Sequence, residues 1–245
     1  MIEVTGLSKS FGKKEAAKDV TFRAEPGALT YLLGPNGAGK TTVLRMIAGL
    51  SRPSSGTISI NGSRLRALPD VKREISFCLG AFVRNPNHTG RQHLRWQARL
   101  AGIDTADADR VLELVGLSDV AKRPTGKYSY GMLQRLGIAT ALLGDPRTIV
   151  LDEPANGLDV EGTLWLRDLL TGLANEGKCL LVASHSLSEV EINASWVIIM
   201  GQGRVLSNTS RDEIVAAGTE PRRLESAYLD ITRNSVEYAG TGGAR

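Results

Sequence analysis

The sequence predicts an α/β fold, and three observations carry the prediction. In the last third of the chain, strand-like and helix-like segments alternate, which is typical of parallel strands joined by helices. Residues 2–60 hold short β-rich segments that end in Gly or Pro-Gly turns,. Residues 89–143, between these parts, have the apolar spacing of helices,. We therefore expect a sheet flanked by helices, with a helical segment inserted in mid-chain.

The first half of the chain opens with strands. Short β-rich runs predict strands at residues 2–6, 19–24, 28–33 and 57–60,. A helix is expected at residues 40–50, where Val43, Leu44, Ile47 and Leu50 recur at helical spacing,. In the middle, Gly116 is expected to end one helix, and Ser129 to cap the next, over residues 131–143,.

The second half alternates strand and helix. Strands are expected at residues 148–151, 179–183 and 196–200, and helices at 161–175 and 187–193,. Ser186 with Glu189, and Ser210 with Glu213, have the spacing of a capping box, which predicts a helix start at each serine,. The glycine-rich tail from about residue 240 is predicted to be disordered,.

Composition limits the classes of protein that fit. With 245 residues and 42% hydrophobic composition, the chain can bury one core and carry an inserted subdomain. Its apolar runs are far shorter than the roughly 20 residues that span a bilayer, and no secretory signal opens it, so we expect a cytoplasmic protein. The net charge is +4, with Lys and Arg spread among nearly as many acids, so no nucleic acid is expected as a partner.

A glycine-rich loop supplies the first functional motif. It lies between an apolar strand and a helix, and it reads Gly34-Pro35-Asn36-Gly37-Ala38-Gly39-Lys40-Thr41, followed by Thr42. This is the P-loop pattern in its required context. Backbone N–H groups and the helix N-terminus would bind a triphosphate. Lys40 would pair with the β and γ phosphates, and the Thr41 hydroxyl would bind Mg²⁺.

Two carboxylates follow a buried strand in the second half. Asp152 and Glu153 end the run Thr148-Ile149-Val150-Leu151, at the sheet edge where ligands bind in α/β proteins. Adjacent strand residues point in opposite directions, so the two acids can do different work. We expect Asp152 to orient Mg²⁺ and Glu153 to polarise the water that attacks the γ-phosphate.

A further segment narrows the class from nucleotide-binding proteins in general. Tyr128-Ser129-Tyr130-Gly131-Met132-Leu133-Gln134-Arg135 resembles the signature segment of ABC ATPases, Leu-Ser-Gly-Gly-Gln and the following Gln-Arg helix. Ser129 and Gly131 are retained, whereas Tyr128, Tyr130 and Met132 are replacements. The resemblance implies that this segment closes on the γ-phosphate held by a second subunit. Ser129 as a helix cap alone is the alternative.

Three more matches follow the family's order. Phe11 stands where the family has an aromatic residue that stacks on adenine, although a lone aromatic residue could equally belong to the core. Asp159 ends Ala155-Asn156-Gly157-Leu158-Asp159, which resembles the loop through which two subunits sense each other. His185 follows the strand at 179–183, at the position of the switch histidine that contacts the γ-phosphate.

One position departs from the family pattern. The family carries a glutamine at the end of the strand that enters the helical subdomain, where it links Mg²⁺ to the membrane partner. The corresponding position here is Gly80. Glycine has no side chain to bind a metal, so water or a neighbour would complete the Mg²⁺ shell, or the coupling is altered. Gln92 and Gln97 follow in sequence but are poorly placed to substitute.

The resemblance covers about residues 2–210 and is closest to bacterial exporter ATPases whose permease is a separate chain. It implies a P-loop NTPase of ABC type, with a mixed sheet core, an antiparallel β subdomain and an inserted helical subdomain. We expect an ATPase domain at 1–220, its helical subdomain at about 81–145, and a short C-terminal extension at 221–245.

The function that follows is ATP hydrolysis that powers export of a small molecule, drug or peptide. The implied cofactors are ATP and Mg²⁺. The implied partners are a second ATPase subunit and a membrane-spanning permease, whose coupling helix would dock near residues 81–100, with the protein peripheral on the inner membrane face. A regulatory subunit that binds ATP and hydrolyses it weakly is the alternative, motivated by Gly80. Cytosolic ABC proteins of translation or DNA repair fit less well, because they carry two such domains or long insertions.

Overall fold

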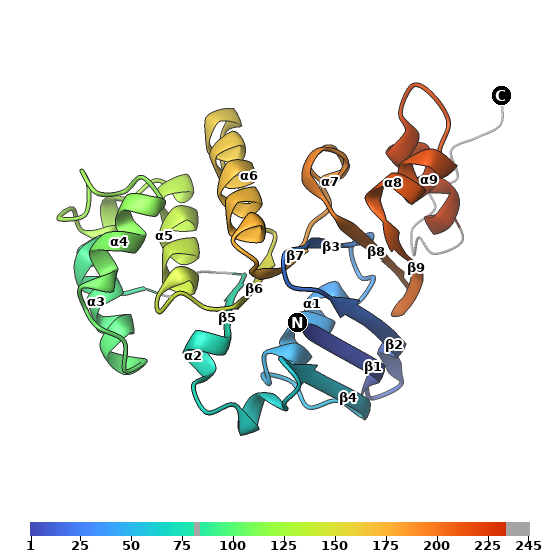
Figure 1. Cartoon of the computed structure of the whole chain (residues 1–245), viewed down its shortest axis with the longest axis horizontal. Coiled ribbons are helices and arrows are strands. Elements are labelled where there is room, and N and C mark those ends of the chain that lie inside the picture. Colours follow the sequence, from blue (N-terminus) through green and yellow to red (C-terminus); the bar gives the residue numbers. More distant parts are fainter. Residues whose placement is uncertain (81–83, 234–245) are drawn as a thin grey trace.

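The computed structural model describes residues 1–80 and 84–233, and it consists of two sheets with helices around them (Figure 1). The predicted disordered tail lies outside the described residues, as do the first residues of the predicted helical subdomain and of its docking surface. None of the helices in the described ranges is long and apolar enough to cross a membrane.

The smaller sheet is antiparallel. Its strand order is β2-β1-β4, with β1 paired to both neighbours. The strands are β1 (Ile2–Phe11), β2 (Lys14–Ala24) and β4 (Ser55–Ile60). The first two strands are longer than predicted, because their polar outer halves alternate poorly in hydrophobicity yet pair through the backbone, with register shifts along the pair.

The larger sheet has the strand order β5-β6-β7-β3-β8-β9. All neighbours are parallel except β8 and β9, which confirms the parallel strands predicted for the last third. The strands are β3 (Leu29–Leu33), β5 (Ile75–Leu79), β6 (Thr148–Asp152), β7 (Cys179–Ala183), β8 (Trp196–Gly201) and β9 (Arg204–Ser210).

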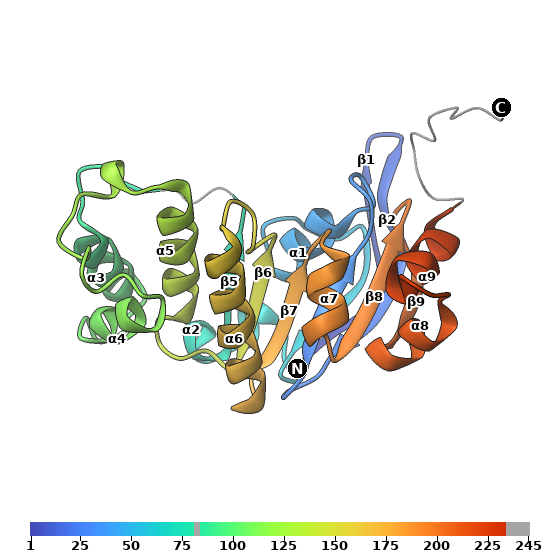
Figure 2. The same ribbon diagram turned by 90° about the horizontal axis from the view of Figure 1, so that it is seen from above.

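Helices gather in three places (Figures 1 and 2). A helical block beyond the β5 edge holds α3 (Gly90–Leu100), α4 (Asp107–Leu114) and α5 (Tyr130–Leu142). The two faces of the larger sheet carry α1 (Lys40–Ile47) on one side and α6 (Val160–Asn175) and α7 (Leu187–Asn193) on the other. At the β9 edge lie α8 (Arg211–Ala217) and α9 (Arg223–Thr232). The short helical turns are η1 (Leu65–Ala67), α2 (Val71–Glu74) and η2 (Thr125–Lys127).

Two hydrophobic cores share the strands of the larger sheet. In β3, Tyr31 and Leu33 pack into the core beneath α6 and the helical block, whereas Leu32 packs into the core formed with α1 and the smaller sheet. In β7, Val182 and Leu181 divide in the same way. Because successive strand side chains face opposite sides, each central strand contributes to both cores, and this explains the continuous apolar runs in the sequence.

The two predicted capping boxes have different outcomes. At α8, Ser210 and Glu213 form the full reciprocal box, which confirms that prediction. At α7 the prediction of a capping box is wrong: the helix begins after Ser186, but the serine side chain makes no cap hydrogen bond. Glu189, which would complete the box, is instead paired with Arg167 of α6, 3.0 Å away. Ser129 caps α5 as predicted, accepting from Met132 N at 3.2 Å.

Candidate functional site

The glycine-rich loop joins β3 to α1, as predicted, and its shape requires glycine. A Cβ on Gly34 would lie 2.4 Å from the carbonyl oxygen of Met200. A Cβ on Gly39, whose φ is +101°, would lie 2.4 Å from the carbonyl oxygen of Ala16. Any side chain at these positions would force the backbone apart, so the loop can adopt this conformation only with glycine there. The residues between them, 35–38, lead into the start of α1.

Lys40 is buried at the start of α1 and turns back onto its own loop. Its Nζ donates to the carbonyl oxygens of Gly34 at 2.5 Å and Pro35 at 3.4 Å. Burial lowers the pKa of Lys40, against the opposing effect of the Glu153 and Asp152 carboxylates. A buried cation held mainly by carbonyl dipoles is well suited to exchange them for the charged oxygens of a phosphate.

The two residues predicted to hold a metal ion lie together. Thr41 Oγ1 donates to Asp152 Oδ2 at 3.1 Å, across 111 residues of sequence. Asp152 ends β6 and Thr41 lies in the first turn of α1. A hydroxyl and a carboxylate beside a phosphate-binding loop are oxygen donors of the kind that Mg²⁺ takes, together with substrate phosphates and water. The donor set therefore fits Mg²⁺ bound with a nucleotide.

Glu153 follows in a backbone conformation that is uncommon for a residue with a side chain. Its φ is +52°, in the left-handed region, which costs on the order of 1–3 kcal/mol and persists only when the surroundings enforce it. Its N–H donates to the Ala183 carbonyl at 2.9 Å, which ties it to the end of β7. From this turn the carboxylate reaches the loop after β7.

That loop carries His185. Its Nδ1 lies 2.7 Å from Glu153 Oε2. An ionised carboxylate can only accept, so the ring donates from Nδ1 and leaves Nε2 available for a second contact. The imidazole side chain is 64% exposed and therefore open to a ligand. The structure thus brings together a carboxylate and a histidine that are 32 residues apart in sequence.

Gln134 belongs to this site, and sequence reasoning gave it no role. Its Nε2 lies 3.3 Å from the carbonyl oxygen of Glu153 and 3.2 Å from that of Pro154. The signal was present in the Gln-Arg pair that follows the signature segment. Its meaning was hidden because the partners are backbone atoms, which carry no mark in the sequence.

The signature segment lies beside the 153–159 loop. Tyr130, which stands where the family has a glycine, packs its exposed ring against Gly157: a Cβ there would lie 2.0 Å from Tyr130 Cδ1. Gly131 lies against the same turn. A Cβ on Gly131 would lie 3.4 Å from the Gly157 carbonyl oxygen, so this position has room for a side chain. Asp159 caps α6, its Oδ1 accepting from Gly162 N at 2.8 Å. Ser129 is exposed at the start of α5.

Phe11 and Gly80 lie at exposed positions. Phe11 ends β1 with its ring 56% exposed and Lys9 Nζ 5.0 Å from the ring centroid, so the alternative that it is a core residue is wrong. Gly80 follows β5, whose Leu79 pairs with Asp152 of β6, so it lies at the same sheet edge as the acids. Its φ is +72°, and a Cβ on this residue would meet no atom of the described residues within 4 Å. Gln92 is committed to the capping box of α3 with Thr89.

Comparison with known proteins identifies the family to which this site belongs. A family model described as ABC transporter matches residues 17–156. The chain belongs to the ABC transporter family. The bacitracin transport ATP-binding protein BcrA of Bacillus licheniformis is 40% identical over 220 residues, which are 87% of this chain and 71% of BcrA. The lantibiotic transport ATP-binding protein SrtF of Streptococcus pyogenes is 32% identical over 216 residues, 86% of this chain and 92% of SrtF.

Solved ABC structures share the fold. An ATP-binding subunit of an ABC transporter, 30% identical, superposes with a TM-score of 0.85 over 95% of this chain and 99% of that one. The dimeric bacterial ABC transporter cassette MJ0796, 25% identical, gives 0.77 over 86% of this chain and 99% of the other. This protein is therefore an ATP-binding subunit of an ABC transporter and an ATPase, and its family implies a membrane permease as partner.

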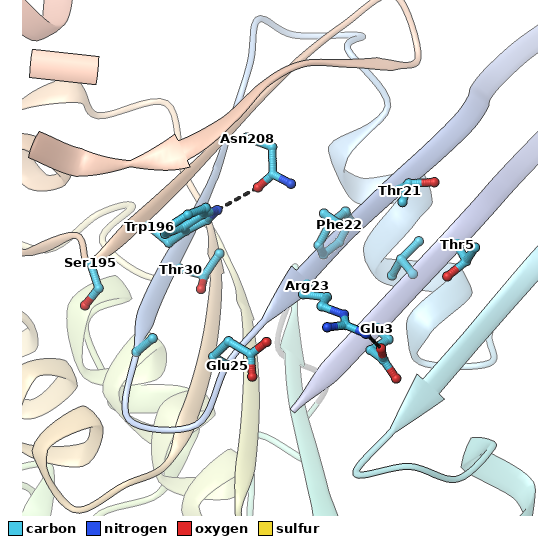
Figure 3. A pocket seen from close by; sticks show the side chains of 12 residues that line it. Glu3, Thr5, Thr21, Phe22, Arg23, Glu25, Thr30, Ser195, Trp196 and Asn208 are labelled. Carbon is cyan, nitrogen blue, oxygen red and sulfur yellow. Dashed lines mark hydrogen bonds and ion pairs between the residues drawn. The ribbon is translucent and has the colours of Figure 1, made fainter. Parts of the chain in front are cut away.

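The ABC ATPase has one pocket beside the glycine-rich loop and another that is lined by other residues. One of about 260 Å³ adjoins the glycine-rich loop and is lined by Asn36, Gly37, Ala38, Gln202 and three charged residues of β2, Lys14, Glu15 and Lys18. Another, of about 560 Å³, lies between β1–β2 and the β8–β9 pair (Figure 3). There Trp196 donates to Asn208 Oδ1 at 2.6 Å, and Arg23 pairs with Glu3. This second pocket is lined by none of the residues 34–42, 152, 153 or 185.

Proposed function

We propose that this ATPase powers the export of a peptide antibiotic through a separate membrane permease, by ATP-driven closure of two ATPase subunits. The relatives named for transport of bacitracin and of lantibiotics support this class of cargo. The permease chooses the cargo in this proposal, and the ATPase supplies the work. The protein is then peripheral on the inner face of the membrane, with the permease docked on the helical subdomain.

The residues divide the chemistry between them. Residues 34–42 bind the phosphates, with Lys40 exchanging its carbonyl partners for β and γ oxygens. Thr41 and Asp152 hold Mg²⁺, which would neutralise charge on the β and γ phosphates when bound. Glu153 takes up the proton of the attacking water and is aligned by His185, whose Nε2 faces the γ-phosphate. Phe11 stacks on the adenine base. The observation that carries the proposal is the pairing of Glu153 with His185 beside Lys40, Thr41 and Asp152.

Two further roles involve the second subunit. Ser129, Gly131 and the N-terminal turn of α5 bind the γ-phosphate held by the partner subunit, since exposed backbone N–H groups at a helix start favour anions. Asp159 and the loop at residues 155–159 contact the partner subunit when the two subunits close. In this proposal each ATP lies between the P-loop of one subunit and the signature segment of the other.

The test is Mg²⁺-dependent ATP hydrolysis by the wild-type protein and two variants, with dimerisation followed by light scattering. Glu153→Gln should bind ATP, stop hydrolysing it and accumulate as an ATP-bound dimer, because a neutral amide cannot take up the proton of the water. Lys40→Ala should lose ATP binding. Unchanged turnover of Glu153→Gln would remove Glu153 as the general base.

A regulatory subunit with weak hydrolysis remains the second candidate, because Gly80 leaves the Mg²⁺ edge without the family's glutamine. The paired Glu153 and His185 speak against it, since a site used only for binding needs neither. ATP binding without hydrolysis by the wild-type protein, in the presence of its permease, would favour this second candidate.

A further inference from the structure

Helix α5 connects two functional parts of the chain. Ser129 caps it and Tyr130 begins it, and one turn further along Gln134 reaches the loop that follows β6 (Figure 2 shows α5 beside β5 and α6). The side-chain amide of Gln134 has two N–H donors, and the carbonyls of Glu153 and Pro154 lie 3.3 and 3.2 Å from its nitrogen. One side chain thus holds two successive peptide groups.

These peptide groups determine where the Glu153 carboxylate points. The left-handed conformation of Glu153 is not intrinsically favoured, so surrounding contacts must maintain it. Its N–H is held by Ala183, and its carbonyl also accepts from Asn156 N at 3.2 Å. Of these contacts, the one from Gln134 is made by a side chain, and it comes from the helix that bears the signature segment.

We propose that Gln134 is a positioning residue for ATP hydrolysis: it fixes the backbone of Glu153 and thereby couples the start of α5, where the partner's nucleotide would bind, to the general base of its own site. The inference rests on the proposed function of Glu153 and Ser129. A shift of α5 on contact with a γ-phosphate would move the Glu153 and Pro154 carbonyls with it, because the amide joins them directly. Hydrolysis at one site would then depend on contact at the other.

Gln134→Met is the first test, because methionine keeps the length of the side chain and removes both donors. We expect kcat for ATP hydrolysis to fall roughly 10- to 100-fold, as misplacement of a catalytic group by about 1 Å can cause. KM and the dissociation constant for ATP should change less than about twofold, since the phosphate-binding loop is untouched. The matched control is Asn175→Met, which removes an exposed side-chain amide at the end of α6 and should retain wild-type kcat. Wild-type kcat in Gln134→Met would overturn the proposal.

Gln134→Glu separates hydrogen bonding from mere packing. An ionised carboxylate has no donor for the two carbonyls, whereas a protonated carboxyl group donates again. Facing carbonyl oxygens, the new carboxyl group should have a raised pKa. The ratio of the variant's kcat to the wild-type kcat should therefore rise as the pH is lowered from about 8 to about 6. Dividing by the wild type removes the titration of other groups, and a ratio that stays flat overturns the proposal.

The failures of the two proposals can be told apart. If the wild-type protein shows no Mg²⁺-dependent hydrolysis, the proposed function fails and Gln134 has no reaction to support. If the wild type hydrolyses ATP and Glu153→Gln does not, while both Gln134 variants keep wild-type kcat at all pH values, the proposed function stands and the role of Gln134 is refuted.

Discussion

At the scale of single residues, the backbone conformation decides what a substitution costs. Gly80 has a φ of +72°, and Gly172 is exposed within α6; at both, a Cβ would meet no atom of the described residues within 4 Å. A methyl group fits at both positions, so sterics alone would predict the same outcome. The backbone predicts opposite ones, because the left-handed region penalises every residue with a Cβ and the helix favours alanine.

We therefore predict that Gly80→Ala lowers the free energy of unfolding by about 1 kcal/mol, while Gly172→Ala raises it by about 0.5–1 kcal/mol. Urea denaturation of the two variants and the wild type measures both. Because a Cβ would meet no described atom at either position, equal effects of the same sign would contradict the left-handed conformation of Gly80.

At the scale of secondary-structure elements, the caps of α7 and α8 offer a matched comparison. Both helices follow a serine with a glutamate three residues later, yet only Ser210 at α8 makes the cap hydrogen bonds. Ser210→Ala should lower the free energy of unfolding by about 1 kcal/mol, whereas Ser186→Ala should change it by less than about 0.5 kcal/mol. Equilibrium denaturation measures the difference, and a loss at Ser186 equal to that at Ser210 would contradict the assignment of caps.

The same comparison shows what the sequence could predict at this scale. The strand at 179–183 and the helix at 187–193 have the predicted ends, because the hydrophobic pattern and the flanking residues agree. The hydrogen bonding at the start of α7 could not be predicted, since Glu189 is drawn to Arg167, a residue of another helix. Likewise the P-loop and the acids were found from motifs, whereas Gln134 acts on backbone carbonyls that no motif marks.

At the scale of the whole molecule, a buried histidine links stability to pH. His93 of α3 is 1% exposed, in the helical block, with Thr140 Oγ1 of α5 3.5 Å from its Nε2. Burial, with a smaller effect from His88, lowers the pKa of His93 to about 4. The unfolded chain takes up this proton near pH 6.5 and the folded protein only near pH 4,. The contribution of neutral, buried His93 to the free energy of unfolding is therefore fully present above pH 6.5, and it is lost as the pH falls from about 6.5 to about 4,.

We predict that His93→Gln makes the melting temperature less dependent on pH between about 6.5 and 4, with the lost contribution amounting to at most roughly 3 kcal/mol. Thermal unfolding of both proteins across this range measures it. Other acidic groups titrate alike in the two proteins, so their difference isolates His93. An identical pH dependence in the variant would show that His93 takes up its proton at the same pH in the folded protein as in the unfolded chain.

The sharing of each central strand between two cores has a consequence for cooperativity. A strand with Leu32 on one side and Tyr31 on the other cannot lose one core and keep its place in the second, so the smaller sheet and the helix-covered face should melt as one unit. The strand that holds them together is β3, and it leads directly into Gly34 and the P-loop. The rigidity of the phosphate-binding loop thus depends on the packing of the smaller sheet. Substitutions that weaken the packing of the smaller sheet should therefore lower the stability of the P-loop together with that of the whole protein.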